Sequence, residues 1–144
     1  MTVARILRQK GSADVATITA AETVADAAAA LSSKRIGALV VSNDGKAVAG
    51  IISERDVVRW LGTDGATCLS MPVADVMTAK VVTCAPEDDV AEIMQRMTTG
   101  RFRHIPVIED GRLAGVISIG DVVKYRMDVL QHEAEALTDM IKGY

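Results

Sequence analysis

The chain has 144 residues, a net charge of −3 and an aromatic content of 3%. This length suits one compact domain or two small ones joined tightly. The acidic balance and the scarcity of aromatic side chains argue against nucleic-acid binding. No apolar run approaches the roughly 20 residues that span a bilayer, and the first residues lack the apolar core of a secretory signal. We therefore expect a cytoplasmic protein without membrane contact.

The first half of the chain predicts helices and strands in alternation. Apolar positions recur through Val3–Lys10 and Gly11 follows as a stop, so a short leading helix is expected. Thr23 is a preferred N-cap residue for the alanine-rich stretch after it. The apolar runs 37–41 and 48–52 predict buried strands. The remaining elements are a strand over 15–18, a helix from Thr23 through Ser33, and a helix from Ser53 that ends before Gly62.

The second half repeats this order after a break in composition. Residues 63–71 hold turn formers and small side chains, so a linker is expected there. Pro72 suits the first turn of a short helix through Val76. The other expected elements are a strand from Val81 that Pro86 ends, a helix over 88–100, hairpin strands over 104–108 and 113–117, and a last helix from Ser118 to Lys142. The end of that helix has a sparse apolar face, which we expect to pack either on its own protein or on a second copy.

A nine-residue stretch occurs twice in the chain. Gly50–Val58 and Gly115–Val123 lie 65 positions apart, and each predicts a buried strand that runs into a helix at a serine N-cap. The match extends upstream, at an offset of 66, to an apolar helical stripe and an Asp-Gly hairpin signal. The matched residues are Val24, Ala27, Ala28 and Leu31 with Val90, Ile93, Met94 and Met97, and Asp44-Gly45 with Asp110-Gly111. The chain therefore contains two copies of one unit, each ordered strand, helix, strand, hairpin turn, strand and helix.

The two strand-to-helix junctions carry residue types that suit a phosphorylated sugar. A helix N-terminus offers free N–H groups and a positive dipole to an anion. Ser53 and Ser118 add a hydroxyl there, and an aspartate one turn later can accept two hydrogen bonds from a vicinal diol. A serine followed three residues later by an aspartate is also a variant of the capping box, which needs no ligand. The residues alone therefore leave a nucleotide site and plain helix capping both open.

These motifs resemble a tandem pair of CBS domains, the module named after cystathionine β-synthase. The resemblance covers about Val3–Lys124 and rests on Gly50–Asp56, Gly115–Asp121, the two hairpins and Arg101–Val107. It implies an α+β fold in which two βαββα units pack through their sheets with pseudo-twofold symmetry. The implied divisions are a first unit with its leading helix over 1–62, the linker over 63–71, a second unit over 72–130 and a helical extension over 131–144.

Proteins that resemble this chain bind adenosine ligands in two clefts between the units. AMP is the first expectation, with ADP, ATP, NAD(H) and S-adenosylmethionine as alternatives, and stand-alone pairs often form homodimers. By position, the resemblance assigns Asp56 and Asp121 to the ribose hydroxyls. The other residues that it places at the ligand are Ser53 and Ser118 facing phosphate, Arg55 and its counterpart Gly120, Thr17 and Thr83 bordering the adenine, Arg35, Ile36, Gly37 and Ala38 in one cleft, and Arg103, His104, Ile105 and Pro106 in the other.

Departures between the two copies predict that the clefts are not equivalent. Arg55 lies inside the first motif, where it can reach a phosphate, and Gly120 replaces it in the second. The second unit also carries two prolines of the family pattern that the first unit lacks. These are Pro86 and Pro106, which align with Ala20 and Val40. Because the second unit matches the family better, the cleft that contains Asp121 is the first expected site of binding.

Three classes of function follow from these patterns. The leading expectation is a regulatory sensor of adenine nucleotides without catalysis, whose regulated partner protein has no signature in the sequence. The alternative is an oligomerisation module with vestigial clefts. An enzyme is disfavoured because the glycine-rich dinucleotide and Walker patterns are absent, and because His104 and His132 are better explained as a core and a surface residue. Cys68 and Cys84 are too few for a zinc site, so no catalytic or metal-binding residue is predicted.

Overall fold

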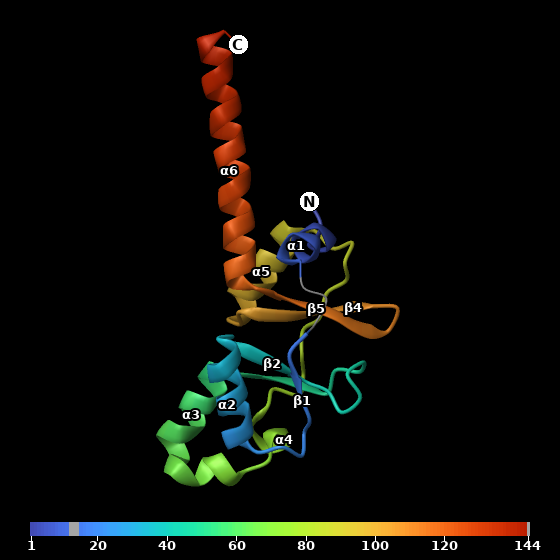
Figure 1. Ribbon diagram of the computed structural model, residues 1–144, viewed down its shortest axis with the longest axis vertical. Helices are drawn as coiled ribbons and strands as arrows, with labels where there is room; N and C mark the ends of the chain where they lie inside the picture. The colour runs from blue at the N-terminus through green and yellow to red at the C-terminus, as the bar shows by residue number, and fades with distance from the viewer. Residues whose placement is uncertain (12–14, 144) are drawn as a thin grey trace.

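The computed structural model describes residues 1–11 and 15–143 as two units whose sheets face each other, with the helices outside (Figure 1). The first unit contains β1 (Thr17–Ile18), α2 (Val24–Lys34), β2 (Ala38–Val41), β3 (Gly50–Ser53) and α3 (Glu54–Asp64). The second contains α5 (Val90–Gly100), β4 (His104–Glu109), β5 (Arg112–Ser118) and α6 (Ile119–Lys142). The helix α1 (Val3–Lys10) precedes the first unit and α4 (Val73–Val76) precedes the second. The 3-10 helix η1 (Gly65–Ser70) follows α3 and comes before α4 in the chain. This arrangement confirms the predicted α+β class and the duplicated unit.

The first unit has a three-stranded sheet in the order β1-β2-β3. β1 runs parallel to β2, and β3 runs antiparallel to it with Ala38 opposite Ser53. The predicted N-cap of α2 forms as a full capping box, because the Thr23 hydroxyl accepts from the Asp26 N–H and the Asp26 carboxylate accepts from the Thr23 N–H. The predicted apolar stripe of α2 packs on the sheet, and its members Val24, Ala27 and Leu31 belong to the core of this unit.

The second unit departs from the prediction at its first strand. β4 and β5 form the expected hairpin, and Asp110 and Gly111 both have positive φ, as a two-residue turn of the primed type requires. The strand expected from Val81 is instead a single bridge between Cys84 and Val107. Pro106 explains the difference, because a proline has no N–H to donate. The equivalent residue of the first unit, Val40, donates its N–H to the Ala16 carbonyl at 3.2 Å and so extends the pairing.

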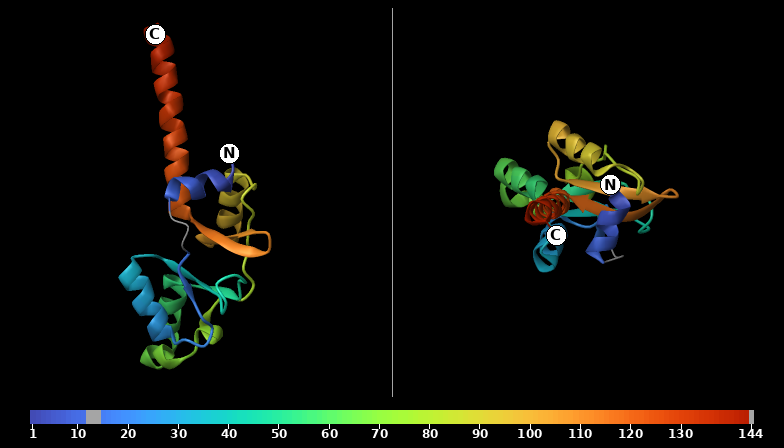
Figure 2. Two further views of the ribbon diagram at one scale, coloured as in Figure 1. Left: turned by 45° about the vertical axis from the view of Figure 1, so that its right-hand side comes forward. Right: turned by 90° about the horizontal axis from the view of Figure 1, so that it is seen from above.

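The two leading helices are exchanged between the units. α1 begins the chain, yet its Val3 and Ile6 are buried in the core of the second unit, and Figure 2 shows α1 beside the upper sheet and the base of α6. α4 precedes the second unit, yet its Val73 and Val76 belong to the core of the first. Matching backbone hydrogen bonds hold both helices, since the Val3 N–H donates to the Asp88 carbonyl and the Val73 N–H donates to the Glu22 carbonyl. Each unit is therefore completed by the helix that precedes the other.

The segment between the units is more ordered than the sequence predicts. α3 was expected to end before Gly62, but it continues to Asp64 and ends at Gly65, which has a φ of 67°. Much of the segment expected as a linker is then η1, whose Cys68 is fully buried. A glycine inside a helix is only mildly unfavourable, so Gly62 does not stop α3. The packing of this segment, which local sequence signals do not report, decides where the helix ends.

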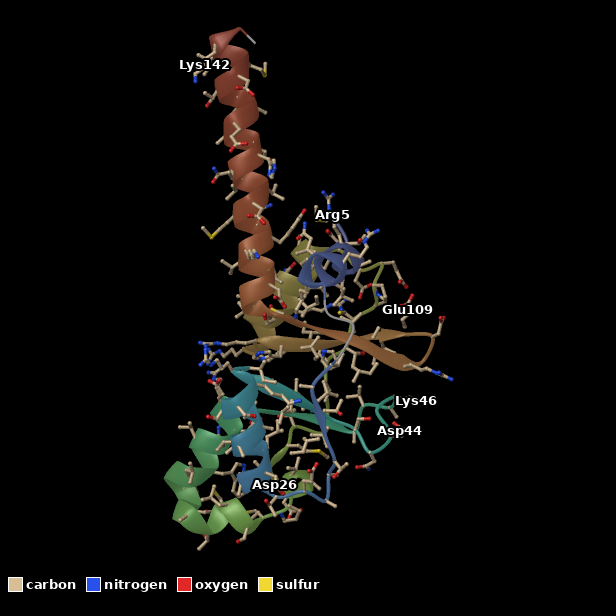
Figure 3. All side chains as sticks on the ribbon, in the orientation of Figure 1. Arg5, Asp26, Asp44, Lys46, Glu109 and Lys142 are labelled. Carbon is tan, nitrogen blue, oxygen red and sulfur yellow. The ribbon has the colours of Figure 1, made fainter. Side chains whose placement is uncertain are left out.

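The helix α6 projects far beyond the rest of the chain. It begins at the predicted N-cap Ser118, and Val122 is its one buried residue. Every residue from Leu130 to Gly143 is exposed, and Figure 3 shows side chains leaving the upper part of α6 with no other described element beside them. The end of α6, from Leu130 onward, therefore does not pack on its own protein within the described residues. None of the helices formed by these residues is long and apolar enough to cross a membrane.

Candidate functional site: two clefts between the units

Both predicted strand-to-helix junctions form capping boxes. The Ser53 hydroxyl accepts from the Asp56 N–H at 3.4 Å, and Oδ2 of Asp56 accepts from the Ser53 N–H at 2.9 Å. The same pair of bonds joins Ser118 and Asp121 at 3.1 and 2.9 Å. The structural explanation of the motif is thus correct, but the cap engages only Oδ2 of each aspartate. The second oxygen, Oδ1, is left for other partners.

Each junction faces the opposite unit across a cleft. Cleft A, with a volume of about 390 Å³, combines Ser53 and Asp56 of the first unit with the stretches 81–82 and 100–104 of the second. Cleft B, about 460 Å³, combines Ser118 and Asp121 of the second unit with the stretches 15–16 and 35–38 of the first. The two clefts are related by the internal repeat. Each places the junction of one unit against the segment that precedes α2 or α5 of the other unit and against the residues that follow that helix.

The structure brings most of the predicted site residues to these clefts. In cleft A they are Gly37, Ser53, Arg55, Asp56, Arg103 and His104. In cleft B they are Arg35, Ile36, Gly37, Ala38, His104, Ser118 and Asp121. Five predicted residues line neither cleft: Thr17 and Thr83, which are exposed, Ile105 and Pro106, which are buried, and Gly120. The cleft residues nearest to these threonines are instead Val15 and Ala16, just before β1, in cleft B, and Val81 and Val82, just before the Cys84 bridge, in cleft A.

Several lining residues have no signal in the sequence motif. Lys10 reaches cleft B from α1, and Lys80 and Thr78 reach cleft A from the chain after α4, because the leading helices are exchanged. Arg59 lies one helical turn after Asp56, and its guanidinium is 3.8 Å from the Asp56 carboxylate. Of these, only Arg59 follows from local spacing, because residues i and i+3 share a helix face.

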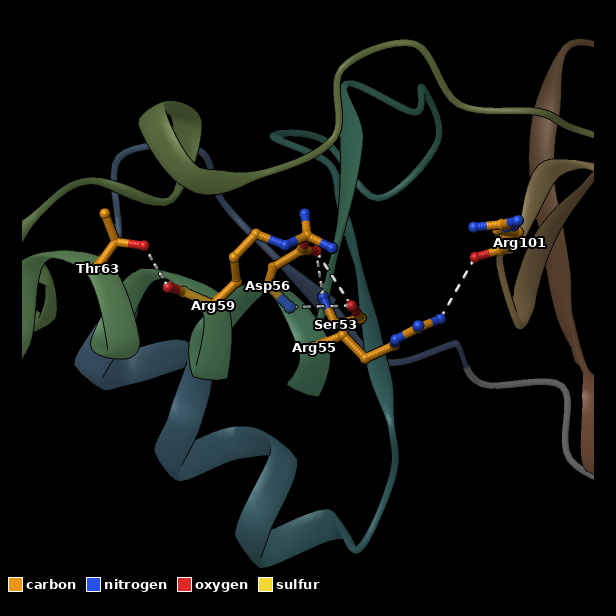
Figure 4. A network of polar contacts seen from close by, with 6 residues as sticks. All are labelled: Ser53, Arg55, Asp56, Arg59, Thr63 and Arg101. Carbon is orange, nitrogen blue, oxygen red and sulfur yellow. Dashed lines mark hydrogen bonds and ion pairs between the residues drawn. The ribbon is translucent and has the colours of Figure 1, made fainter.

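Two arginines at the cleft edges have an unusual backbone conformation. Arg35 and Arg101 occupy equivalent positions after α2 and α5, and their φ values are 54° and 56°. A non-glycine residue in the left-handed region costs about 1–2 kcal/mol, so strain of this kind often marks functional positions. Arg55 contacts one of them across the gap, since its Nη1 donates to the Arg101 carbonyl at 3.3 Å (Figure 4). Cleft A is therefore bridged by a polar contact between the units.

The two clefts differ in charge. Among the described residues, cleft A is lined by the basic side chains of Arg55, Arg59, Lys80, Arg101 and Arg103 and by the acidic Glu54 and Asp56. Cleft B has two basic residues, Lys10 and Arg35, and one acidic residue, Asp121. A cluster of arginines from both walls favours an anionic ligand. Cleft A is the more strongly basic of the two.

The titratable groups of the clefts are held in defined states. Burial lowers the pKa of His104 below its usual 6.5, against the opposing effect of Asp121 and Glu54, so this shared residue is neutral at pH 7. Burial disfavours the charge of Asp121, but hydrogen bonds from Lys10 and Ser118 outweigh it and hold its pKa below 3.8. Lys10 donates to Asp121 Oδ2 and to the Val116 carbonyl, both at 2.9 Å.

No catalytic chemistry stands out in the described residues. Burial, and then the Asp88 carboxylate, raise the pKa of the Cys84 thiol to about 11, so it is not an activated nucleophile. Within residues 1–11 and 15–143, no group of three or more His, Cys, Asp or Glu side chains is arranged to hold a metal ion. The chemistry that the clefts do offer is the binding of an anion beside a hydroxyl-rich group.

Comparisons with known proteins agree with this geometry. A family model described as the CBS domain matches residues 3–63 and 73–128. A mitochondrial CBS domain-containing protein of Arabidopsis thaliana is 40% identical, covering 99% of this chain and 72% of its own length.

Solved structures show the same fold. A crystal structure of a CBS-domain containing protein from Agrobacterium tumefaciens has 45% sequence identity and a TM-score of 0.83, covering 88% of this chain and 99% of its own. A CBS domain protein from Pyrobaculum aerophilum, complexed with AMP, has a TM-score of 0.74 over 84% of this chain and 89% of its own. At 24% identity, that second likeness shows the fold alone.

Proposed function

Because the chain belongs to the CBS domain family, we propose that it is a non-catalytic regulatory module that binds an adenosine nucleotide between its two units. AMP is the first candidate, with ADP, ATP, NAD(H) and S-adenosylmethionine as the alternatives. The AMP complex of the Pyrobaculum aerophilum protein supports this ligand class for the fold. The observation that carries the proposal for this chain is the basic lining of cleft A around an aspartate at a helix N-terminus.

Each part of a nucleotide has a counterpart in cleft A. Oδ1 of Asp56, which the cap leaves unused, can accept from the ribose hydroxyls. The N-terminus of α3 and the arginines around it suit the phosphate. Ile51, Val81 and Val82 supply aliphatic walls for the base. This assignment gives the capping motif a second role without removing the first.

Ligand binding in such a cleft would couple the two units. The cations that would hold a phosphate come from both sides, Arg55 and Arg59 from the first unit and Arg101 and Arg103 from the second. A ligand that contacts both walls favours the arrangement in which they are close, and so shifts the population toward it. This shift is the signal that a regulated partner protein would read.

Thermal unfolding with a panel of AMP, ADP, ATP, NAD, NADH and S-adenosylmethionine tests the proposal. A ligand at about 100 times its dissociation constant adds roughly 2.7 kcal/mol of stability, which is a shift of about 5–10 °C for a domain of this size. The double variant Asp56→Asn, Asp121→Asn keeps the capping acceptors and should abolish the shift. No shift with any of these compounds would contradict the proposal.

A second candidate function, homo-oligomerisation, is favoured by the exposed face of α6. Val123, Met127, Leu130, Leu137 and Ile141 are all exposed, and together with Ala134 they are spaced alternately four and three residues apart. This is the heptad pattern by which two identical helices associate. An isolated helical segment of this length is marginal in water, so a partner helix would stabilise it. We propose that the protein is a homodimer joined at least partly through this face.

Sedimentation equilibrium tests the homodimer. The double variant Leu130→Glu, Leu137→Glu places charges in the apolar face and should convert a dimer into a monomer. The matched control, His132→Glu with Ala136→Glu, adds the same residues on the opposite face of α6 and should leave the dimer intact. A wild-type protein that sediments as a monomer at all concentrations would exclude this candidate.

A further inference from the structure

Lys10 places a fixed cation inside cleft B. Its Nζ donates to Oδ2 of Asp121 and to the carbonyl of Val116, both at 2.9 Å. The side chain of Asp121 is 20% exposed and that of Lys10 is 38% exposed, so the pair is partly shielded from water. The residue that would accept the ribose hydroxyls in cleft B is therefore already the partner of an ammonium group.

The position of Lys10 is set by the packing of α1. Val3 and Ile6 are buried in the core of the second unit, and Leu7 lies against Gly115 in the strand that lines the cleft. The N–H of Val3 donates to Asp88 at 2.9 Å. α1 then ends at Gly11, which has a φ of 69°. Because α1 is held at its start and along its apolar face, its last residue, Lys10, has a fixed position in cleft B.

Cleft A has a counterpart of Lys10 that is not engaged in this way. The leading helices repeat as Met1-Thr2-Val3-Ala4 and Met71-Pro72-Val73-Ala74, which aligns Lys10 with Lys80 at an offset of 70. Lys80 lines cleft A, but the ion pair of Asp56 is with Arg59, at 3.8 Å. The side chain of Arg59 is 69% exposed, and an exposed pair at that distance is worth little. Asp56 therefore has no cation at hydrogen-bond distance among the described residues, whereas Asp121 has Lys10 at 2.9 Å, although the Asp56 side chain is the less exposed of the two, at 11% against 20%.

We infer that Lys10 determines which cleft a nucleotide fills first, because its ion pair weakens cleft B and leaves cleft A as the stronger site. The inference rests on the proposed function, and it reverses the order expected from the sequence motifs. A ribose diol that enters cleft B meets a carboxylate whose Oδ2 already accepts a charge-assisted hydrogen bond from Lys10 at 2.9 Å, whereas in cleft A the paired cation, Arg59, lies 3.8 Å from Asp56 Oδ1 and is largely exposed. Lys10 is then a specificity-determining residue that lies outside the repeated motif.

Calorimetric titration with AMP at low ionic strength tests the inference. The wild-type protein should show one stronger and one weaker site. In an Asp56→Asn background, which silences cleft A, the remaining binding reports cleft B. Adding Lys10→Met, which keeps the aliphatic stem and removes the charge, should tighten that binding by roughly threefold to fivefold. The matched control Lys46→Met, in the exposed β2–β3 loop and outside both clefts, should not change it.

The outcomes separate the inference from the proposed function. Tighter binding on removal of the Lys10 charge, with no effect of Lys46→Met, supports the inference. Unchanged binding, or binding that weakens because Lys10 itself holds the phosphate, overturns it while the proposed function stands. If neither the wild type nor any variant binds AMP, the proposed function fails for this ligand and the inference fails with it.

Discussion

Cleft A and cleft B are built from the same repeated motif, yet they differ in the charges around it. Both contain a serine and an aspartate joined in a capping box at a helix N-terminus. Cleft A is lined by five basic residues, and its aspartate has only a long ion pair with Arg59 at 3.8 Å, whereas the aspartate of cleft B is bonded to Lys10 at 2.9 Å. The two copies differ at Arg55, which aligns with Gly120, and at Arg103, which aligns with Gly37. Lys10 and Lys80 are equivalent lysines, but the ion pair with the aspartate is made by Lys10. The two copies thus share the cap and differ in the charges around it.

The largest expected effect concerns the two glycines that begin the repeated stretch, Gly50 and Gly115. A Cβ on Gly50 would lie 2.7 Å from the Thr78 carbonyl and 2.6 Å from the Met77 sulfur, whereas a Cβ on Gly115 would meet only the Leu7 side chain. Because backbone cannot move aside as a flexible side chain can, Gly50→Ala should destabilise the protein by about 2–3 kcal/mol and Gly115→Ala by about 1 kcal/mol. Urea denaturation of both variants measures this difference. Equal losses would mean that the surroundings of the two glycines are equally adaptable.

The next effect is on nucleotide binding. Asp56→Asn should weaken AMP binding at the stronger site by about tenfold or more, since it removes a charged acceptor of the ribose hydroxyls. Asp121→Asn should change that site little, because it acts in the weaker cleft. Both substitutions keep an oxygen for the cap, so similar unfolding midpoints are the control for folding. A larger loss with Asp121→Asn would restore the order expected from the sequence.

The next prediction concerns His104, which lines both clefts, and the pH dependence of the free energy of unfolding. Its pKa in the folded protein lies below 6.5 because of burial, despite Asp121 and Glu54 nearby. Between 6.5 and the lower folded value, the unfolded chain binds more protons than the folded protein, so the free energy of unfolding falls as the pH falls. His104→Gln should remove this part of the pH dependence, while His132→Gln on exposed α6 should not. Unfolding measured from pH 7.5 to 5 gives the comparison.

The smallest expected effect is the contribution of the Lys10–Asp121 pair to stability. The folded pKa of Asp121 is below 3.8, so the stabilisation is present above that value and is lost as the pH falls through the folded pKa. Because the pair is partly exposed, Lys10→Met should cost only about 0.5 kcal/mol at pH 7. The cost should diminish as the pH falls through the folded pKa of Asp121. A loss that persists in acid would come from packing of the lysine stem instead.

Much of the fold follows from the sequence because its signals are local. The apolar stripe of α2, the Asp110-Gly111 turn and the serine caps all depend on residues within a few positions of one another. The predicted end of α3 was wrong because the packing of the following segment decides where that helix ends. The strand predicted from Val81 was wrong because Pro106, on another strand, lacks the N–H that would pair with it. Pro106 acts on a segment about twenty residues earlier, where no local pattern reports the missing donor.

The features of the candidate site also divide into those that follow from local sequence and those that depend on tertiary packing. The sequence by itself determined the repeated unit, the two caps and the aspartates at their ends, since spacing along one helix fixes these positions. Only the tertiary structure decided that α1 completes the second unit and that Lys10 meets Asp121, 111 positions away along the chain. The physical reason is that such a contact depends on where the apolar face of α1 is buried. Two helices with the same apolar spacing can pack on either unit, and the choice between them belongs to the whole core.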